Sequence, residues 1–230
     1  MSLEAGEAAP FLSPSGKPLL EVRRLLRTPY ATAHALQEQL VAQRIDGQIS
    51  DQLLLTEHDP VITVGRSGEV MPTQLGGVPV VQVERGGEAT YHGPGQLVAY
   101  PIVRLDEKRR DLHRYLRDLE EVVIRTLAEV AVKGTRKEGL TGVWVKDKKI
   151  CSLGVAVRRW VAWHGFALNL HTDLGVFRHF RPCGLDPDVM TRLADHVEIP
   201  AGTLLFEVLT AKHFCAVFGH DLTRLSESAS

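Results

Sequence analysis

The sequence predicts a single domain of the mixed α/β (α+β) class, in which a mixed sheet is flanked by helices. Short apolar runs bounded by Gly, Pro or Asp come in groups, as strands do, and a few separate segments carry apolar residues at helical spacing. Strands grouped in this way are typical of α+β or mixed-sheet α/β domains. The length of 230 residues and the hydrophobic content of 44% allow a sizeable core without disulfides or a structural metal.

The N-terminal half contains one predicted helix and several predicted strands. We expect residues 1–18, which are rich in Ala, Gly, Ser, Pro and Glu, to form a disordered tail that precedes a folded domain over residues 19–225. A helix follows Pro29, with apolar residues from Ala33 to Ile45 and a stop at Gly47. Strands are expected over residues 53–55, 61–64, 78–83 and 97–100.

The C-terminal half alternates helices and strands. A second helix is expected from Asp111 to about Ala131 and a third over residues 203–218. Residues 226–230 have the composition of a second tail. Strands are expected over residues 142–145, 150–157 and 161–170, the last two joined by a hairpin at Arg158-Arg159.

Charge and cysteine content narrow the class of protein. The net charge is −1, from 27 basic and 28 acidic residues, and shows no basic excess of the kind that nucleic-acid binders carry. Cys151, Cys183 and Cys215 are odd in number and form no C-x-x-C pair, which argues against a disulfide framework and a zinc ribbon. Since we find no secretory signal and no apolar run of transmembrane length, we expect a cytoplasmic protein with no membrane partner. A monomer is the default, and we expect no nucleic-acid partner, no metal and no cofactor.

One segment that could carry chemistry is rich in glycine. Residues 85–96 read R-G-G-E-A-T-Y-H-G-P-G-Q and hold four glycines directly after a predicted strand. Glycine lets the backbone approach a ligand closely. The segment lacks the Lys-Ser/Thr ending of a P-loop and the spacing of a dinucleotide fingerprint, so it indicates either a tight loop or a binding wall of another kind.

Three single residues are further candidates. Cys183 lies between a proline and a glycine, in a turn that could present its thiol to a cleft, whereas cysteines in strands and on apolar helix faces are usually inert. Lys149 lies at the edge of an apolar run, where its side chain could point inward. Gly165 interrupts an apolar strand, for which core packing is the default reading and a close backbone approach the alternative.

Taken together, these segments resemble the octanoyltransferase family of lipoate biosynthesis, also called lipoate-protein ligase B. The T-Y-H-G-P-G-Q string is the most specific of them, and His34 and Met71-Pro72 match no feature of the family. The matching pieces follow the family's order: G-R at 65–66, R-G-G at 85–87, T-Y-H-G-P-G-Q at 90–96, K-I at 149–150 with Gly154, H-G-F-A-L-N at 164–169 and R-P-C-G at 181–184.

The resemblance implies an octanoyltransferase catalytic domain over residues 19–225, similar in fold to the catalytic domains of biotin and lipoate protein ligases. It implies transfer of an octanoyl group from octanoyl-acyl carrier protein to a lysine of lipoyl domains, in 2-oxoacid dehydrogenase E2 subunits and the glycine cleavage H protein, as the first step of endogenous protein lipoylation. The acyl group would rest on Cys183, with Lys149 as its partner. The implied substrate-binding residues are Arg85, Gly86, Gly87, Glu88, Ala89, Thr90, Tyr91, His92, Ser152, Leu153, Gly154, Gly165, Phe166 and Ala167.

The implied chemistry needs these residue types. An ordinary cysteine thiol has a pKa of about 8.5, so only a few per cent is thiolate at neutral pH, and a neighbouring Lys149 ammonium would favour the thiolate. Exchange of one thioester for another keeps the acyl group activated without ATP. Neutral Lys149 could then take a proton from the acceptor amine. His92 is the rival base, because Cys-His pairs are commoner than Cys-Lys pairs, and His164 fits an ordinary core histidine.

Other functions stay open at this point. An ATP-dependent lipoate-protein ligase on the same fold would form an adenylate and need no nucleophilic cysteine. A non-catalytic acyl-binding or lipoyl-domain-binding module would keep the pocket without turnover, although the presence of both Lys149 and Cys183 argues against it. A cysteine hydrolase would use water as the acceptor.

Overall fold

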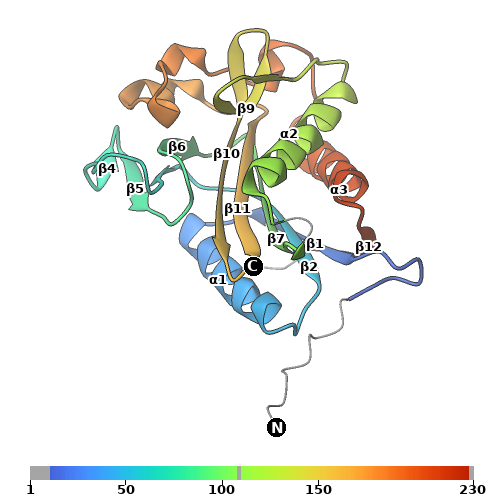
Figure 1. Ribbon diagram of the computed structural model, residues 1–230. Coiled ribbons are helices and arrows are strands. Elements are labelled where there is room, and N and C mark those ends of the chain that lie inside the picture. The colour runs from blue at the N-terminus through green and yellow to red at the C-terminus, as the bar shows by residue number, and fades with distance from the viewer. Residues whose placement is uncertain (1–10, 108–109, 228–230) are drawn as a thin grey trace.

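A mixed eight-stranded sheet runs through the centre of the molecule, as the computed structural model shows for residues 11–107 and 110–227 (Figure 1). Its strand order is β12-β1-β2-β7-β11-β10-β9-β8. β12, β1 and β2 pair in parallel, and the other neighbours are antiparallel. The strands are β1 (Leu19–Arg27), β2 (Asp51–Glu57), β7 (Gln96–Arg104), β8 (Thr135–Lys137), β9 (Leu140–Val145), β10 (Lys148–Arg158), β11 (Val161–Asn169) and β12 (Asp221–Glu227).

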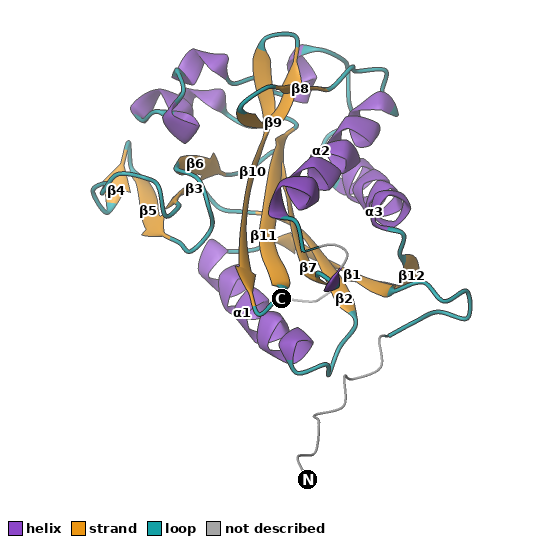
Figure 2. Ribbon diagram, in the orientation of Figure 1, coloured by secondary structure: helices purple, strands orange, loops and turns teal. Residues whose placement is uncertain are grey.

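Helices cover both faces of this sheet (Figure 2). α1 (Tyr30–Ile45) packs on one face, and α2 (Leu112–Ala128) and α3 (Leu204–Phe218) pack on the other. Alternation along the strands divides the core between the two faces: Leu53 and Leu55 lie with α2 and α3, whereas Leu54 lies with α1.

A second sheet has the strand order β4-β5-β3-β6. Its strands are β3 (Val61–Val64), β4 (Gln74–Leu75), β5 (Val78–Gln82) and β6 (Ala89–His92). Its apolar residues pack against Phe177, Phe180 and Met190, which come from a stretch of short 3-10 helices. These helices are η2 (Leu174–His179), η3 (Pro182–Gly184), η4 (Pro187–Val189) and η5 (Leu193–Asp195). The packing brings β6, part of the glycine-rich segment, against η3, which holds Cys183.

The predicted mixed α/β class is confirmed, and each predicted helix is found within a few residues of its expected limits. The hairpin expected at Arg158-Arg159 joins β10 to β11, and its turn residues Arg159 and Trp160 both have positive φ, as the tight type I′ turn requires. None of the helices in the described part of the chain combines the length and apolarity that a membrane span needs.

Several strands are not predicted by the sequence. β1 reads L-L-E-V-R-R-L-L-R, without strict alternation, and is held by pairing with both β2 and β12. β6 lies in the segment that glycine content marks as a loop. β12 extends to Glu227 and so includes residues 226–227 of the expected C-terminal tail, because Ser226 and Glu227 pair with Arg23 and Arg24 of β1.

The N-terminal segment is described only in part. Residues 1–10 lie outside the described residues, and so does the start of the tail expected over residues 1–18. Residues 11–18 form a loop in which Leu12 bridges to Pro18 and the Ser13 hydroxyl donates to the Asp221 carboxylate at 2.7 Å.

Candidate active site

Cys183 occupies a strained turn. It has φ 51° and ψ 37°, in the left-handed backbone region that residues other than glycine rarely adopt. The N–H groups of Gly184 and Leu185 close the turn by donating to the carbonyl oxygens of Arg181 and Pro182. The Pro-Cys-Gly sequence therefore holds the thiol at a fixed angle, at a cost of about 1–2 kcal/mol for the left-handed residue.

The three thiols differ in their surroundings. Cys151 is fully buried in β10, and burial raises its pKa. Burial likewise raises the pKa of Cys215 on α3. Cys183 is half-buried and, unlike the other two, lines the cavity described next.

A small cavity lies between the two sheets at Cys183. Its volume is about 30 Å³, which is room for about two water molecules. The lining residues come from α1, the loop before β6, β6, β7, β10, β11 and η3. They are Tyr30, Arg85, Thr90, His92, Val98, Tyr100, Ser152, Leu153, Gly154, His164, Gly165, Phe166, Ala167 and Cys183.

The cavity gathers most of the predicted substrate-binding residues but not all. The ones it brings together are Arg85, Thr90, His92, Ser152, Leu153, Gly154, Gly165, Phe166 and Ala167. The predicted residues outside its lining are Gly86, Gly87, Glu88, Ala89 and Tyr91. On β6 the reason is alternation: Thr90 and His92 face the cavity, whereas Ala89 and Tyr91 face the core of the second sheet.

The glycines and Glu88 shape the backbone around the cavity. Gly86 donates its N–H to the carbonyl oxygen of Val155, and a Cβ at Gly154 would lie 2.9 Å from the carbonyl oxygen of Gly86. The Glu88 carboxylate lies beside the Cys183 turn, since a Cβ at Gly184 would lie 2.8 Å from its Oε2 atom. These residues support the wall without lining it.

Lys149 lies on β10, next to the cavity lining but not in it. Its residue is 3% exposed, and its Nζ atom lies 5.8 Å from the centre of the Trp144 ring. The pairing of β9 with β10 shifts register between Lys149 and Cys151, and a bulge of this kind re-aims side chains. Within the described residues, the ammonium has no hydrogen-bond or ion-pair partner, and the Lys149 carbonyl oxygen accepts the N–H of Thr191.

His92 is held by hydrogen bonds at both ring nitrogens. Gln96 uses its amide nitrogen to donate to the Tyr91 carbonyl and to Asn169 Oδ1, so its Oε1 accepts from His92 Nδ1 at 2.8 Å. Nε2 lies 3.3 Å from the Thr63 hydroxyl. Burial, and then the nearby His58 and Arg85, lowers the pKa of His92 to about 3. The imidazole is therefore neutral at ordinary pH and poorly suited to take up a proton.

Arg85 brings a buried positive charge to the cavity. Its residue is 7% exposed, and its guanidinium donates to the carbonyl oxygen and hydroxyl of Thr63 and to the Gly86 carbonyl. No carboxylate of the described residues lies within ion-pair distance of it. Burial lowers the pKa of Arg85, and the charge of a Cys183 thiolate raises it. The guanidinium can therefore stabilise a thiolate or an oxyanion formed at Cys183.

Ser152 offers a hydrogen-bond donor that nothing else in the described residues uses. Its hydroxyl oxygen is buried and has no hydrogen-bond partner, although the residue lines the cavity. A buried hydroxyl without a partner is costly, and a ligand oxygen in the cavity would satisfy it. The cavity thus combines a thiol, a fixed cation, an unused donor and apolar walls from Val98, Leu153 and Phe166.

His164 reaches the cavity through an irregularity in β11. Alternation would point it to the same face as Ala162 and Phe166, but its φ of 56° turns the ring to the α1 side, where it stacks on Trp163. The neighbouring Gly165 has no space for a Cβ, which would overlap the Ala99 carbonyl oxygen of β7. Burial, and then the nearby charges of His34 and Arg85, lowers the pKa of His164 to about 3.

Four lining residues are absent from the sequence-based set: Tyr30, Val98, Tyr100 and His164. Val98 and Tyr100 lie two residues apart on β7, so alternation alone places them on one face. Tyr30 enters only because α1 crosses that face. The H-G-F-A-L-N motif contains His164, but its left-handed conformation carries no signal in the sequence.

Known proteins resemble this chain over most of its length. The sequence-family model of the lipoyl protein ligase A/B catalytic domain matches residues 29–215 of this chain. The octanoyltransferase of Rubrobacter xylanophilus is 50% identical over 204 residues, covering 83% of this chain and 91% of the relative. The octanoyltransferase of Syntrophotalea carbinolica is 45% identical over 195 residues, covering 85% and 92%.

Solved structures share the fold at low sequence identity. A lipoate-protein ligase A bound with ATP matches with a TM-score of 0.71 and 18% identity, over 91% of this chain and 90% of that one. The biotin protein ligase of Aquifex aeolicus matches with a TM-score of 0.51 and 12% identity, over 86% and 69%. The expected likeness to lipoate and biotin ligases is therefore confirmed at the level of the fold. The family match and the two relatives together show that this chain belongs to the lipoyl protein ligase A/B catalytic domain family.

Proposed function

We propose that this chain transfers an octanoyl group from octanoyl-acyl carrier protein to a lysine of lipoyl domains, through an acyl-thioester on Cys183. The observation that carries the proposal is the Cys183 thiol, which lines the cavity beside a buried guanidinium in a chain 45–50% identical to octanoyltransferases. The acceptors would be the lipoyl domains of 2-oxoacid dehydrogenase E2 subunits and the glycine cleavage H protein.

In the first half-reaction, the Cys183 thiolate attacks the thioester carbonyl of the donor. A new carbon–sulfur bond forms, the bond to the carrier sulfur breaks, and the carrier leaves as a thiol after taking up a proton. Arg85 supports the thiolate through its charge, and the Ser152 hydroxyl is positioned to donate to the developing oxyanion. One thioester replaces another, so ATP is not needed.

In the second half-reaction, the acceptor amine attacks the acyl-thioester. The amide bond forms, the bond to Cys183 breaks, and the amine loses a proton. We assign this proton to Lys149, because His92 has both ring nitrogens engaged and a strongly lowered pKa. Support for this role is that Lys149 is a buried lysine on β10, three residues before Ser152 of the cavity lining.

An adenylate-forming ligase is the main alternative, since lipoate-protein ligase A shares the fold. Such a ligase needs no thiol at its reaction centre. A cysteine with a left-handed backbone conformation would there lower the stability without serving the reaction. The same feature favours transfer over a binding module. Hydrolysis differs from transfer only in the acceptor, so it needs a direct comparison.

The test is an assay without ATP. The chain is mixed with octanoyl-acyl carrier protein and a lipoyl domain, and octanoylated domain and free octanoate are both measured. We expect transfer to the domain to exceed hydrolysis, to be lost in Cys183→Ala and to persist in Cys215→Ala, which removes a half-buried thiol of α3. Transfer that requires ATP and free octanoate, or that survives in Cys183→Ala, would contradict the proposal.

The setting of the reaction is part of the proposal. We infer a monomer that acts in the cytoplasm, and three free thiols are what a reducing compartment permits. Exposed Arg158 and Arg159, at the hairpin between β10 and β11, are available to acidic partner proteins. Arg136 serves this purpose less well, because Glu120 and Glu121 of its own chain already pair with it.

A further inference from the structure

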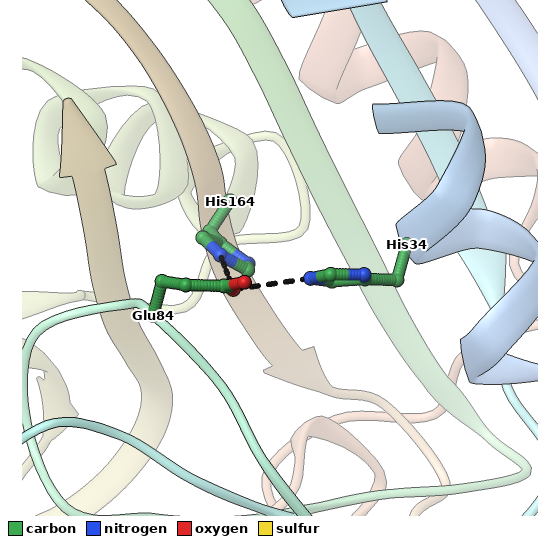
Figure 3. Close-up of side chains that lie close together, drawn as sticks. All are labelled: His34, Glu84 and His164. Carbon is green, nitrogen blue, oxygen red and sulfur yellow. Dashed lines mark hydrogen bonds and ion pairs between the residues drawn. The ribbon is translucent and has the colours of Figure 1, made fainter. Parts of the chain in front are cut away.

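Two histidines and a glutamate converge behind the cavity from three separate parts of the chain. His34 comes from α1, Glu84 from the loop after β5, and His164 from β11 (Figure 3). Oε2 of Glu84 lies 3.1 Å from Nε2 of His34 and 3.6 Å from Nε2 of His164, so the carboxylate lies between the two rings. The three ligand atoms lie within 4.8 Å of one another.

The His164 side chain is directed into this cluster, where its Nε2 atom lies within ion-pair distance of Glu84 but makes no hydrogen bond with it. Its left-handed backbone turns the ring out of the alternation of β11 and toward His34, with ring centres 5.9 Å apart. Its residue is 2% exposed, and Nε2 has no hydrogen-bond partner among the described residues. A buried ring nitrogen without a partner is costly, so something is expected to engage it.

The ligand types and spacing suit a divalent transition metal. Two imidazoles and one carboxylate are a common ligand set for zinc, whereas calcium and magnesium prefer oxygen ligands alone. Metal–ligand bonds of about 2.0–2.2 Å at a tetrahedral angle place ligand atoms about 3.4 Å apart, and the two distances to Glu84, 3.1 and 3.6 Å, lie on either side of that value. The third separation, between the two histidine nitrogens, is at most 4.8 Å.

The surroundings also favour ligation by His34. Its other ring nitrogen, Nδ1, lies 3.8 Å from the Glu38 carboxylate one turn along α1. A carboxylate behind a metal-bound histidine fixes the ring and raises its basicity. The guanidinium of Arg85, next in sequence to Glu84, acts against a cation, so moderate affinity is expected.

We propose that His34, Glu84 and His164 form a binding site for Zn²⁺, with a water molecule as the fourth ligand. The sequence alone predicts no metal site, because the three residues lie 50 and 80 positions apart and share no motif. Since His164 also lines the Cys183 cavity, the metal would fix one wall of that cavity. Metal binding there does not depend on whether the chain catalyses the proposed transfer.

The test uses Co²⁺ as a spectroscopic probe in the full chain carrying Cys183→Ala, so that the cavity thiol cannot bind the metal. We expect one equivalent to bind with the intense visible absorption of four-coordinate Co²⁺, and Zn²⁺ to displace it. Adding His34→Gln or Glu84→Gln should lower the affinity more than about tenfold, since even partners outside the ligand set change metal affinity by about 10–100-fold.

His213→Gln is the matched control. His213 Nε2 lies 2.9 Å from Glu129 Oε1, a histidine–glutamate pair without a second histidine, so its loss should leave Co²⁺ binding unchanged. Thermal unfolding checks that each variant is folded. If His34→Gln fails to fold, the affinity of Glu84→Gln alone tests the site. The Glu84 side chain is 44% exposed, so its replacement should leave the fold intact. Absence of the four-coordinate spectrum, or equal affinity in the two ligand variants and the parent, would overturn the proposal.

Discussion

Gly142 offers a way to move Lys149 without changing it. Gly142 lies on β9 with φ 146°, and a Cβ there would lie 2.6 Å from Cε of Lys149 and 2.9 Å from the Cys151 carbonyl oxygen. Ordinary van der Waals contact begins at 3.4 Å, so the gap must open by 3.4 minus 2.6, about 0.8 Å. Gly142→Ala therefore displaces the lysine, the backbone beside it, or both.

The expected effect on catalysis follows from this distance. A misplacement of about 1 Å in a reacting group can cost about 100-fold in rate, so we expect Gly142→Ala to slow octanoyl transfer by about 30–100-fold. The backbone penalty of alanine at positive φ is about 1–2 kcal/mol. For a domain of this size it lowers the melting temperature by about 2–4 °C for each kcal/mol.

Single-turnover transfer to a lipoyl domain and thermal unfolding are measured together. Gly139→Ala is the control, because Gly139 has φ 72° but nothing within 4 Å of the Cβ position. It should show wild-type transfer and a smaller loss of melting temperature, because it adds the backbone penalty without the close contacts. Wild-type transfer in folded Gly142→Ala, or an equal loss of rate in Gly139→Ala, would refute the reasoning that Lys149 must lie where β9 holds it.

Three further predictions concern the turn and the buried histidines. Cys183→Gly should have a free energy of unfolding about 1 kcal/mol higher than Cys183→Ala, because glycine adopts φ 51° without penalty. The difference should appear as a higher urea midpoint, and equal midpoints would contradict the strain. Since the pKa of His92 is about 3, His92→Gln should be slower but keep the inflections of the wild-type pH–kcat/KM profile, and a lost inflection would identify His92 as the base. Burial lowers the pKa of His58 from 6.5 to about 4. Between these two pH values the unfolded chain binds a proton at His58 and the folded chain does not. The contribution of His58 to the free energy of unfolding should therefore fall by about 1.4 kcal/mol for each pH unit as the pH is lowered from about 6.5 to 4, beside similar contributions from His92 and His164. His58→Gln should reduce the total slope by that amount, and an unchanged slope would contradict the pKa.

Local patterns account for most of the helices and buried strands. The helix after Pro29 and the helix that Asp111 caps follow from apolar spacing and from end signals that act within a few residues. β12 could not be predicted in this way, because its partner β1 lies about 200 residues away in the sequence, and β1 lacks strict alternation and is held by both β2 and β12. Parallel pairing of the two chain ends leaves no local pattern.

The residues of the candidate site also fall into those that local motifs predict and those that depend on tertiary packing. The motifs single out Cys183, Arg85 and His92, and these three residues line one cavity. The contributions of Tyr30 and His34 depend on how α1 crosses the sheet. The direction of the His164 ring depends on a single left-handed residue, and neither can be derived from spacing in the sequence.

The acyl-thioester on Cys183 is the central claim, and trapping it is the most direct test. The chain is incubated with octanoyl-acyl carrier protein, without ATP and without a lipoyl domain, and its intact mass and peptide masses are measured. We predict the addition of one octanoyl group on the peptide that contains Cys183, its absence in Cys183→Ala, and its loss when a lipoyl domain is added. No adduct in a preparation that still transfers octanoate, or an adduct on another residue, would contradict the account.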